Sequence, residues 1–304
     1  NTTLTGSGIT FGSTIKSTGG SNYSLGITDS GVTTLGGAIG SATLADKVSS
    51  LTLSSTGGIS LNAGSVYSTS SQSYTGAVTL GSNTTLSGVG VVFHSAVDGA
   101  KTLTVNDSGT TQFLDKVGYT TALTSVTTDA AGTTDLNGAS VTTTGAQTYN
   151  DAVVLSANTT LTGSGITFVS TVDSTSGNNY SLTVTDGGLT TLGGWLGVSD
   201  RLSSLSISST GGIRMNGGKV YSVGAQSYTG AVTLGGDTTL SGVDVVFHSV
   251  VDGAHSLTVT DSGMTQFLDK VGYTTALTSV TTDAAGTTDL NGASVTTTGA
   301  QTYN

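Results

Sequence analysis

Apolar residues recur at regular intervals along the whole chain, in two series that advance at the same pace. The first series consists of Ile15, Ile39, Leu61, Val78, Val97, Val117, Leu136, Val153, Val172, Leu196, Met215, Val232, Val251, Val271 and Leu290. The second consists of Leu4, Leu25, Leu51, Val66, Leu86, Leu103, Leu123, Val141, Leu161, Leu182, Leu205, Val220, Leu240, Leu257, Leu277 and Val295. A fixed step of about 19 to 20 residues is typical of solenoid proteins and predicts about 16 coils in the chain.

Around these positions polar and apolar residues alternate with a period of two. The segments Thr102–Val105, Thr183–Thr185 and Val89–Phe93 are examples, and such alternation is typical of strands with one buried face. Asp98-Gly99 and Asn137-Gly138 lie between such segments and favour sharp corners. We therefore predict an all-β fold, a right-handed parallel β-helix whose coils pair along their strands about 4.8 Å apart.

The chain is also built from longer repeats. Residues 72–146 and 226–300 are two copies of one 75-residue unit, B, that differ at eight positions. Residues 147–225 form a related unit, A; residues 1–71 match unit A from Asn158 onward; and residues 301–304 begin a further unit. These boundaries predict an alternating array that forms one continuous solenoid, cut as a window from a longer repetitive protein.

The two B copies test which residues point inward. The pairs that differ include Gly90/Asp244, Thr102/Ser256, Asn106/Thr260 and Thr110/Met264. Val89, Val91, Phe93, Leu103 and Val105 do not differ. We expect the side chains at the unchanged, alternating positions of each strand to face the core. The A copies differ in length by three residues between 37–49 and 194–203, which predicts a loop at one corner.

Composition excludes several classes of protein. The chain has no Cys and no Pro, 46 Gly, 9% charged residues and a net charge of −10. Nucleic-acid partners require a basic surface, which this charge opposes. No run of about 20 apolar residues is present to span a membrane, and thiolate metal sites are excluded.

A hydroxyl face is the densest chemical feature. Eleven of the sixteen positions in the second series have Ser or Thr on both sides. We expect these hydroxyls to align along one side of the solenoid, where they could bind a glycan, a surface, ice or a neighbouring rod; the other interpretation is that Thr simply suits the outside of a strand. The contact residues expected there are Thr3, Thr5, Thr102, Thr104, Thr160 and Thr162.

Five aromatic residues are candidates for surface contacts or for the core. Trp195, the only Trp, lies beside the loop of variable length and is a candidate surface contact. The Tyr residues of the Gln-Ser-Tyr-Thr and Gln-Thr-Tyr-Asn segments are expected to fill the core or the corners; these are Tyr74, Tyr149, Tyr228 and Tyr303.

Catalytic and metal sites find little support. His94 and Asp98 lie close in sequence, but a uniform rod provides no cleft in which a nucleophile, a base and an acid converge. We expect no enzymatic activity and no cofactor. Calcium needs six to eight oxygen ligands at one point. The Asp-rich corners near Asp283 and Asp289 are the only places where the sequence leaves a calcium site open.

Two sequence segments resemble the repeats of known proteins. They are Ala-Val-Thr-Leu-Gly-Ser-Asn-Thr-Thr-Leu-Ser-Gly and Thr-Thr-Thr-Gly-Ala-Gln-Thr-Tyr-Asn. With the coil length and the lack of Cys, they make the chain similar to the filamentous-haemagglutinin-like adhesins and related β-strand-repeat proteins of bacteria. The resemblance implies export to the bacterial surface or beyond, a β-helix shaft, and roles in adhesion, biofilms or filaments. We expect the N-terminal secretion domain of such adhesins to lie outside this window, which leaves the route of export open.

Two functions remain open from the sequence. One is a structural rod, in which the repeats set the length of an extracellular filament or adhesin shaft for cell-cell or cell-surface attachment. Its partners would be copies of itself, end to end or side by side, and cell surfaces or glycans. The alternative is a binding module that uses the hydroxyl face. Near-identical copies favour the rod, because added copies increase its reach.

Overall fold

The computed structural model describes residues 1–304 as an all-β solenoid of about 14 turns, built from 37 strands. The one helical element is a 3-10 turn, η1 (Leu44–Asp46). No helix is long and apolar enough to cross a bilayer. The chain divides into two compact units, Asn1–Ala152 and Val153–Asn304.

The first unit contains three parallel ladders. One orders β1 (Thr2–Gly6), β3 (Leu25–Asp29), β5 (Leu51–Ser55), β8 (Gln72–Thr75), β11 (Val91–Phe93), β14 (Thr110–Phe113) and β16 (Thr133–Leu136). A second orders β7 (Ser65–Tyr67), β10 (Thr84–Gly88), β13 (Thr102–Asp107), β15 (Ser125–Thr128) and β18 (Gln147–Tyr149). The third orders β2 (Thr10–Phe11), β4 (Thr33–Leu35), β6 (Ile59–Leu61), β9 (Val78–Leu80) and β12 (Val97–Asp98), and β17 (Ser140–Thr142) follows in the chain.

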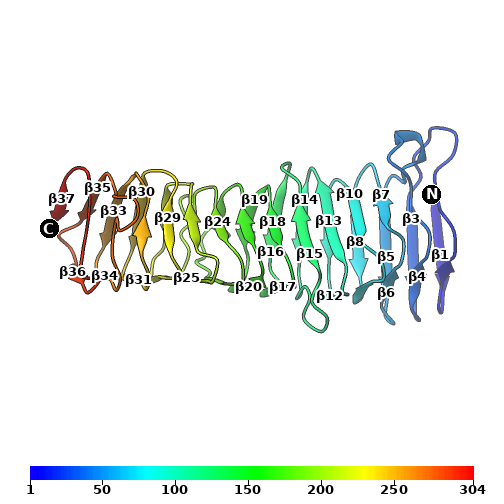
Figure 1. Ribbon diagram of the computed structural model, residues 1–304. Helices are drawn as coiled ribbons and strands as arrows, with labels where there is room; N and C mark the ends of the chain where they lie inside the picture. The colour runs from blue at the N-terminus through cyan, green and yellow to red at the C-terminus, as the bar shows by residue number, and fades with distance from the viewer. The chain divides into compact units, whose positions relative to one another are not determined.

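The second unit repeats this arrangement. One ladder orders β20 (Thr159–Gly163), β23 (Leu182–Asp186), β25 (Leu205–Ser209), β28 (Gln226–Thr229), β31 (Val245–Phe247), β34 (Met264–Phe267) and β36 (Thr287–Leu290). The others order β21 (Ile166–Phe168), β24 (Thr190–Leu192), β26 (Ile213–Met215), β29 (Val232–Leu234) and β32 (Val251–Asp252), and β27 (Lys219–Tyr221), β30 (Thr238–Gly242), β33 (Ser256–Asp261), β35 (Ser279–Thr282) and β37 (Gln301–Tyr303). Strand β19 (Ala152–Leu155) pairs with β22 (Val172–Ser174). In Figure 1 the labels β30, β33, β35 and β37 follow one another along one side of this unit.

The predicted number of coils is wrong, although the parallel solenoid is confirmed. The register runs from Leu4 to Leu136 in six turns, or about 22 residues per turn. The error arises because the second apolar series passes from one ladder to another. Leu51 pairs with Gln72 in one ladder and Val66 pairs with Leu86 in another, so the two residues lie on different faces of a single turn.

Side chains alternate between core and solvent as predicted. In β13, for example, Leu103 and Val105 are buried while their neighbours are partly or fully exposed. Val89 is an exception to the prediction, because it is 47% exposed at the turn between β10 and Gly90, whose φ is 86°. The three-residue length difference between the A copies falls in the irregular segment that contains η1, as expected for a loop.

Stacked aromatic rings fill part of the core. Tyr74 stacks on Phe93 with ring centroids 5.1 Å apart, and Phe93 stacks on Phe113 at 5.4 Å. The second unit repeats the stack with Tyr228, Phe247 and Phe267 at 5.2 and 5.3 Å. Offset stacking of such rings adds about 0.5–1.5 kcal/mol per pair beyond burial. The prediction that the Tyr residues are core fillers is confirmed for Tyr74, Tyr149 and Tyr228, whereas Tyr303 is 39% exposed.

A buried glutamine satisfies each core tyrosine. The hydroxyl of Tyr74 donates to Oε1 of Gln72 at 2.7 Å, and Nε2 of Gln72 donates to the carbonyl oxygen of Ser87 at 2.9 Å. Tyr228 and Gln226 make the same contact at 2.8 Å. Because buried polar groups are costly unless paired, the Gln-x-Tyr segment fixes both side chains in one geometry.

Buried aspartates join one turn to the next. Asp29 ends β3, and its carboxylate accepts hydrogen bonds from the backbone N–H groups of Gly8 and Ile9, one turn earlier, at 2.7 Å each. It also accepts from the N–H of Gly31 at 2.9 Å and the hydroxyl of Thr33 at 2.9 Å. Asp107 and Asp186 are buried with the same four kinds of donor. We call this arrangement the aspartate clip.

The clip predicts an acid-dependent loss of stability. Burial by itself raises the pKa of Asp29, but hydrogen bonds from Ile9, Gly31, Gly8 and Thr33 outweigh it and lower the pKa to about 2. Since this value is below the unfolded one, the carboxylate stabilises the fold above about pH 4, and that contribution disappears as the pH falls toward 2. In urea denaturation, the gap between wild type and Asp29→Asn should therefore shrink over this interval. A gap that stays constant would contradict the assignment.

A fourth buried aspartate, Asp261, occupies the position of Asp107 in the second B copy, but its surroundings differ. Asp244 occupies the position of Gly90, beside the buried Asp261. Burial raises the pKa of Asp261, and the nearby charges of Asp283 and Asp244 raise it further, although the hydroxyl of Thr265 still donates to it at 2.9 Å. The ionised form of Asp261 is therefore disfavoured, whereas that of Asp29 is favoured.

Candidate functional site

The hydroxyl residues predicted as surface contacts lie on the outside of the solenoid, but in three different sheets. Thr3 and Thr5 are exposed on β1, and Thr160 and Thr162 occupy the same places on β20. The row through Thr5 continues with Thr28, Ser54 and Thr75. The row through Thr162 continues with Thr185, Ser208 and Thr229.

Thr102 and Thr104 belong to another ladder, on β13. Thr104 lies in a row that consists of Ser65, Thr85, Thr104, Thr127 and Thr148. The corresponding row of the second unit consists of Lys219, Thr239, Thr258, Thr281 and Thr302. The expectation of a single hydroxyl face is therefore wrong, because residues of the second apolar series occupy more than one side of each turn.

Regularity along these rows is limited. The row through Thr3 passes through Gly26, Thr52, Ser73, Val92, Gln112 and Asp135. A hydroxyl lattice for a periodic ligand requires the same side chain at every step of about 4.8 Å. The Thr rows provide that spacing over four turns at most, beside rows of mixed chemistry.

The His and Asp residues considered for catalysis are not brought together. Nε2 of His94 lies 3.2 Å from the hydroxyl of Ser73, on the neighbouring strand. The carboxylate of Asp98 instead accepts the N–H groups of Thr120 and Thr121, at 2.9 and 3.0 Å. Asp98 thus organises a corner loop, and the Ser73–His94 pair lies on an open strand surface.

The acidic residues named for calcium have other partners. No group of three or more His, Cys, Asp or Glu side chains is placed to hold a metal ion. Oδ2 of Asp289 accepts from Nε2 of Gln266 at 3.2 Å and from Nδ2 of Asn291 at 2.9 Å. Asp283 raises the pKa of the nearby Asp261 by charge repulsion.

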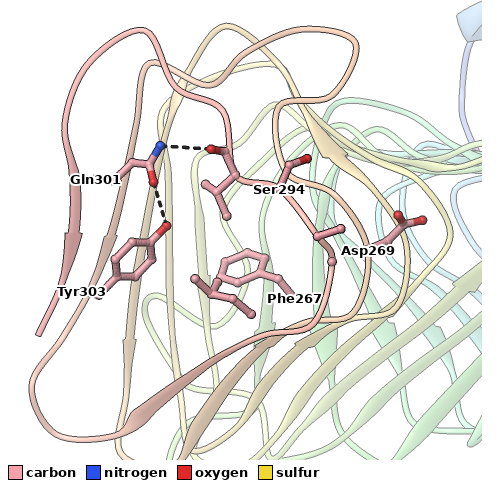
Figure 2. A pocket seen from close by; sticks show the side chains of 9 residues that line it. Phe267, Asp269, Ser294, Gln301 and Tyr303 are labelled. Carbon is pink, nitrogen blue, oxygen red and sulfur yellow. Dashed lines mark hydrogen bonds between the residues drawn. The ribbon is translucent and has the colours of Figure 1, made fainter.

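One hollow of about 300 Å³ is lined by the last turns of the second unit (Figure 2). Figure 2 shows Tyr303 donating to Gln301, the same contact as in the buried copies. Phe267, Leu290, Val295, Gln301 and Tyr303 contribute side chains to its wall. Their counterparts in the first unit, Phe113, Leu136, Val141, Gln147 and Tyr149, are buried. The wall therefore has the chemistry of the core rather than that of a dedicated ligand site.

Trp195 is the predicted contact with the most distinctive surroundings. It is 47% exposed, and Nζ of Lys219 lies 4.6 Å above its ring. On the same strand as Lys219, Tyr221 carries the guanidinium of Arg201 at 5.2 Å from its ring centre. The sequence prediction found Trp195 but missed Lys219 and Arg201. A comparison of the A copies could have found them, since Ser65 and Lys47 stand at those positions in the first copy.

Comparisons with protein-family models, with curated proteins and with solved structures returned no match to this chain.

Proposed function

We propose that the chain is a structural rod of a large repetitive bacterial protein, which forms an extracellular filament or the shaft of a surface adhesin. In this role it is secreted and supports cell-cell or cell-surface attachment, including attachment within biofilms. The observation that carries the proposal is the repetition of the same internal contacts in both units. The aromatic stack and the Gln-x-Tyr contact recur with ring and hydrogen-bond distances that differ by about 0.1 Å.

Neighbour-on-neighbour stability supports this role. Neighbouring turns pair through parallel strands, and stacked rings or aspartate clips join some of them, so additional turns need no new long-range contacts. Only two buried side-chain atoms, Oγ of Ser82 and Oδ1 of Asp135, have no hydrogen-bond partner. A core whose buried polar groups find hydrogen-bond partners within the same or the neighbouring turn suits a protein that acts through its length. The partners in this proposal are further copies of the chain, end to end or side by side, and the surfaces that the filament joins.

The proposal predicts that length increases linearly with copy number. Adding one A–B pair, about seven turns, is expected to lengthen an isolated chain by about 34 Å at a strand spacing of about 4.8 Å. Small-angle scattering and negative-stain electron microscopy of chains with two, three and four A–B pairs would measure the increment. The cross-section should stay constant across the series. Particles that grow in diameter instead, or that fold back into compact globules, would contradict the rod.

A further inference from the structure

Three of the side chains that differ between the two A copies lie close together on the surface of the second copy. Where the first copy has Gly12, Ala38 and Ser65, the second has Val169, Trp195 and Lys219. These residues come from three successive turns, since Leu196 bridges both Val172 and Val220. In the second copy they meet beside a single hollow. The first copy has the same strand pattern but small side chains at these three positions, so it serves as an internal control.

The hollow has a volume of about 350 Å³. Its lining consists of Val169, Ser170, Thr171, Gly193, Gly194, Trp195, Asn216 and Gly217. The base is formed by glycine corners that stack without side chains: a Cβ at Gly217 would overlap the carbonyl oxygen of Gly194, and a Cβ at Gly194 would overlap that of Ser170. Close backbone stacking therefore requires glycine at these two corners, and the side chains of Trp195 and Val169 line the hollow beside them.

Trp195 is held at its backbone by one turn and at its ring by another. The carbonyl oxygen of Trp195 accepts the N–H of Val172 at 2.9 Å, which fixes its backbone to the preceding turn. The ammonium group of Lys219, from the following turn, lies 4.6 Å over the ring, within the range of a cation–π contact. An aromatic wall that is ordered before binding lowers the entropy cost of recognising a ligand.

We propose that this hollow binds a neutral pyranose ring of a polysaccharide. The lining residues themselves carry no charge, and the one cation that contacts them is Lys219, over the Trp195 ring; they combine one large aromatic side chain with two hydroxyl groups and one carboxamide. A pyranose ring has an apolar C–H face that packs on an indole and a rim of hydroxyls that needs neutral donors and acceptors. The volume is at the small end of ligand sites, which suits one or two sugar rings. The net charge of −10 opposes an anionic polymer.

Trp195 permits a direct test, because it is the only Trp in the chain and its fluorescence reports this hollow alone. The probes are neutral hexasaccharides of glucose, mannose and galactose, with a hexauronate as the acidic counterpart. At least one neutral probe is expected to change the emission saturably. By calorimetry, Trp195→Ala should weaken that probe at least tenfold and Lys219→Ser a few-fold, while the matched change Ser65→Ala in the first copy should have no effect.

Three results would overturn the assignment. The first is a lack of saturable binding by every neutral probe at millimolar concentration. The second is tighter binding of the hexauronate than of the neutral probes, since that would make charge the basis of recognition. The third is an unchanged affinity in Trp195→Ala that is shown by circular dichroism to be folded. The rod function does not depend on any of them, because the length series measures it separately.

Discussion

Replacing Phe247 by alanine is expected to lower the free energy of unfolding by about 3–5 kcal/mol, the range found for large aromatic truncations in cores. Phe247 is buried between Tyr228 and Phe267, so its removal leaves a cavity that faces two rings at once. Guanidinium denaturation followed by circular dichroism would measure the change. Val246→Ala is the matched control, since Val246 lies next to Phe247 but points outward and is only partly buried.

The first unit offers an internal replicate of this experiment. Phe93→Ala removes the middle ring of the stack of Tyr74, Phe93 and Phe113, and it should cost the same within about 1 kcal/mol. In repeat proteins such a defect can unfold neighbouring turns separately from the rest, so an additional transition at low denaturant is also an expected result. A loss below about 1 kcal/mol at both positions would show that the stacks do not stabilise the solenoid.

The second large effect is expected from the aspartate clip. Asp107→Asn keeps the shape of the side chain but replaces one acceptor oxygen by a donor, which faces the N–H groups of Gly90 and Gly109 or the donors on the other side. Each buried donor left without a partner costs about 1–3 kcal/mol, and two such losses predict a decrease of about 3 kcal/mol. Thermal and denaturant unfolding of the variant would measure it.

The control for this variant is one residue away. Asn106 is exposed, and the other B copy has Thr260 at that position, so Asn106→Thr should change stability by less than about 0.5 kcal/mol. If Asp107→Asn were equally mild, the carboxylate would not join the turns. Hydrogen exchange at Val91, whose N–H donates to Asp107 at 2.8 Å, would locate the effect, because exchange there should accelerate in Asp107→Asn and not in the control.

The fold was predictable because its signal is local. Strand alternation and Gly or Asn corners act within a few residues, and they identified the parallel solenoid. The number of turns was not predictable, because the step varies from 19 residues between Tyr74 and Phe93 to 26 between Ile27 and Leu53, and only the pairing register shows which apolar residues share a face.

The polar core was harder to predict because its partners are a full turn away. An Asp such as Asp98 was expected to shape a corner, whereas Asp29 and its equivalents are buried against backbone N–H groups about 20 residues earlier. Similarly, Trp195 could be named from its rarity, but the hollow beside it depends on three turns coming together. Gln72 had no local signal for burial, since its acceptor lies at Ser87 in the next turn.

The parallel, in-register stack has a genetic consequence. Residues 111–150 and 265–304 are identical, and the offset of 154 residues between them takes Tyr74 to Tyr228 and Phe93 to Phe247, buried positions to buried positions. Unequal recombination between such copies would therefore delete or insert a complete A–B pair and leave inward and outward parity intact, whereas a slip of one residue would reverse it. A gene of this design can change the length of its product in a single recombination event, and each product still has its apolar residues at inward positions.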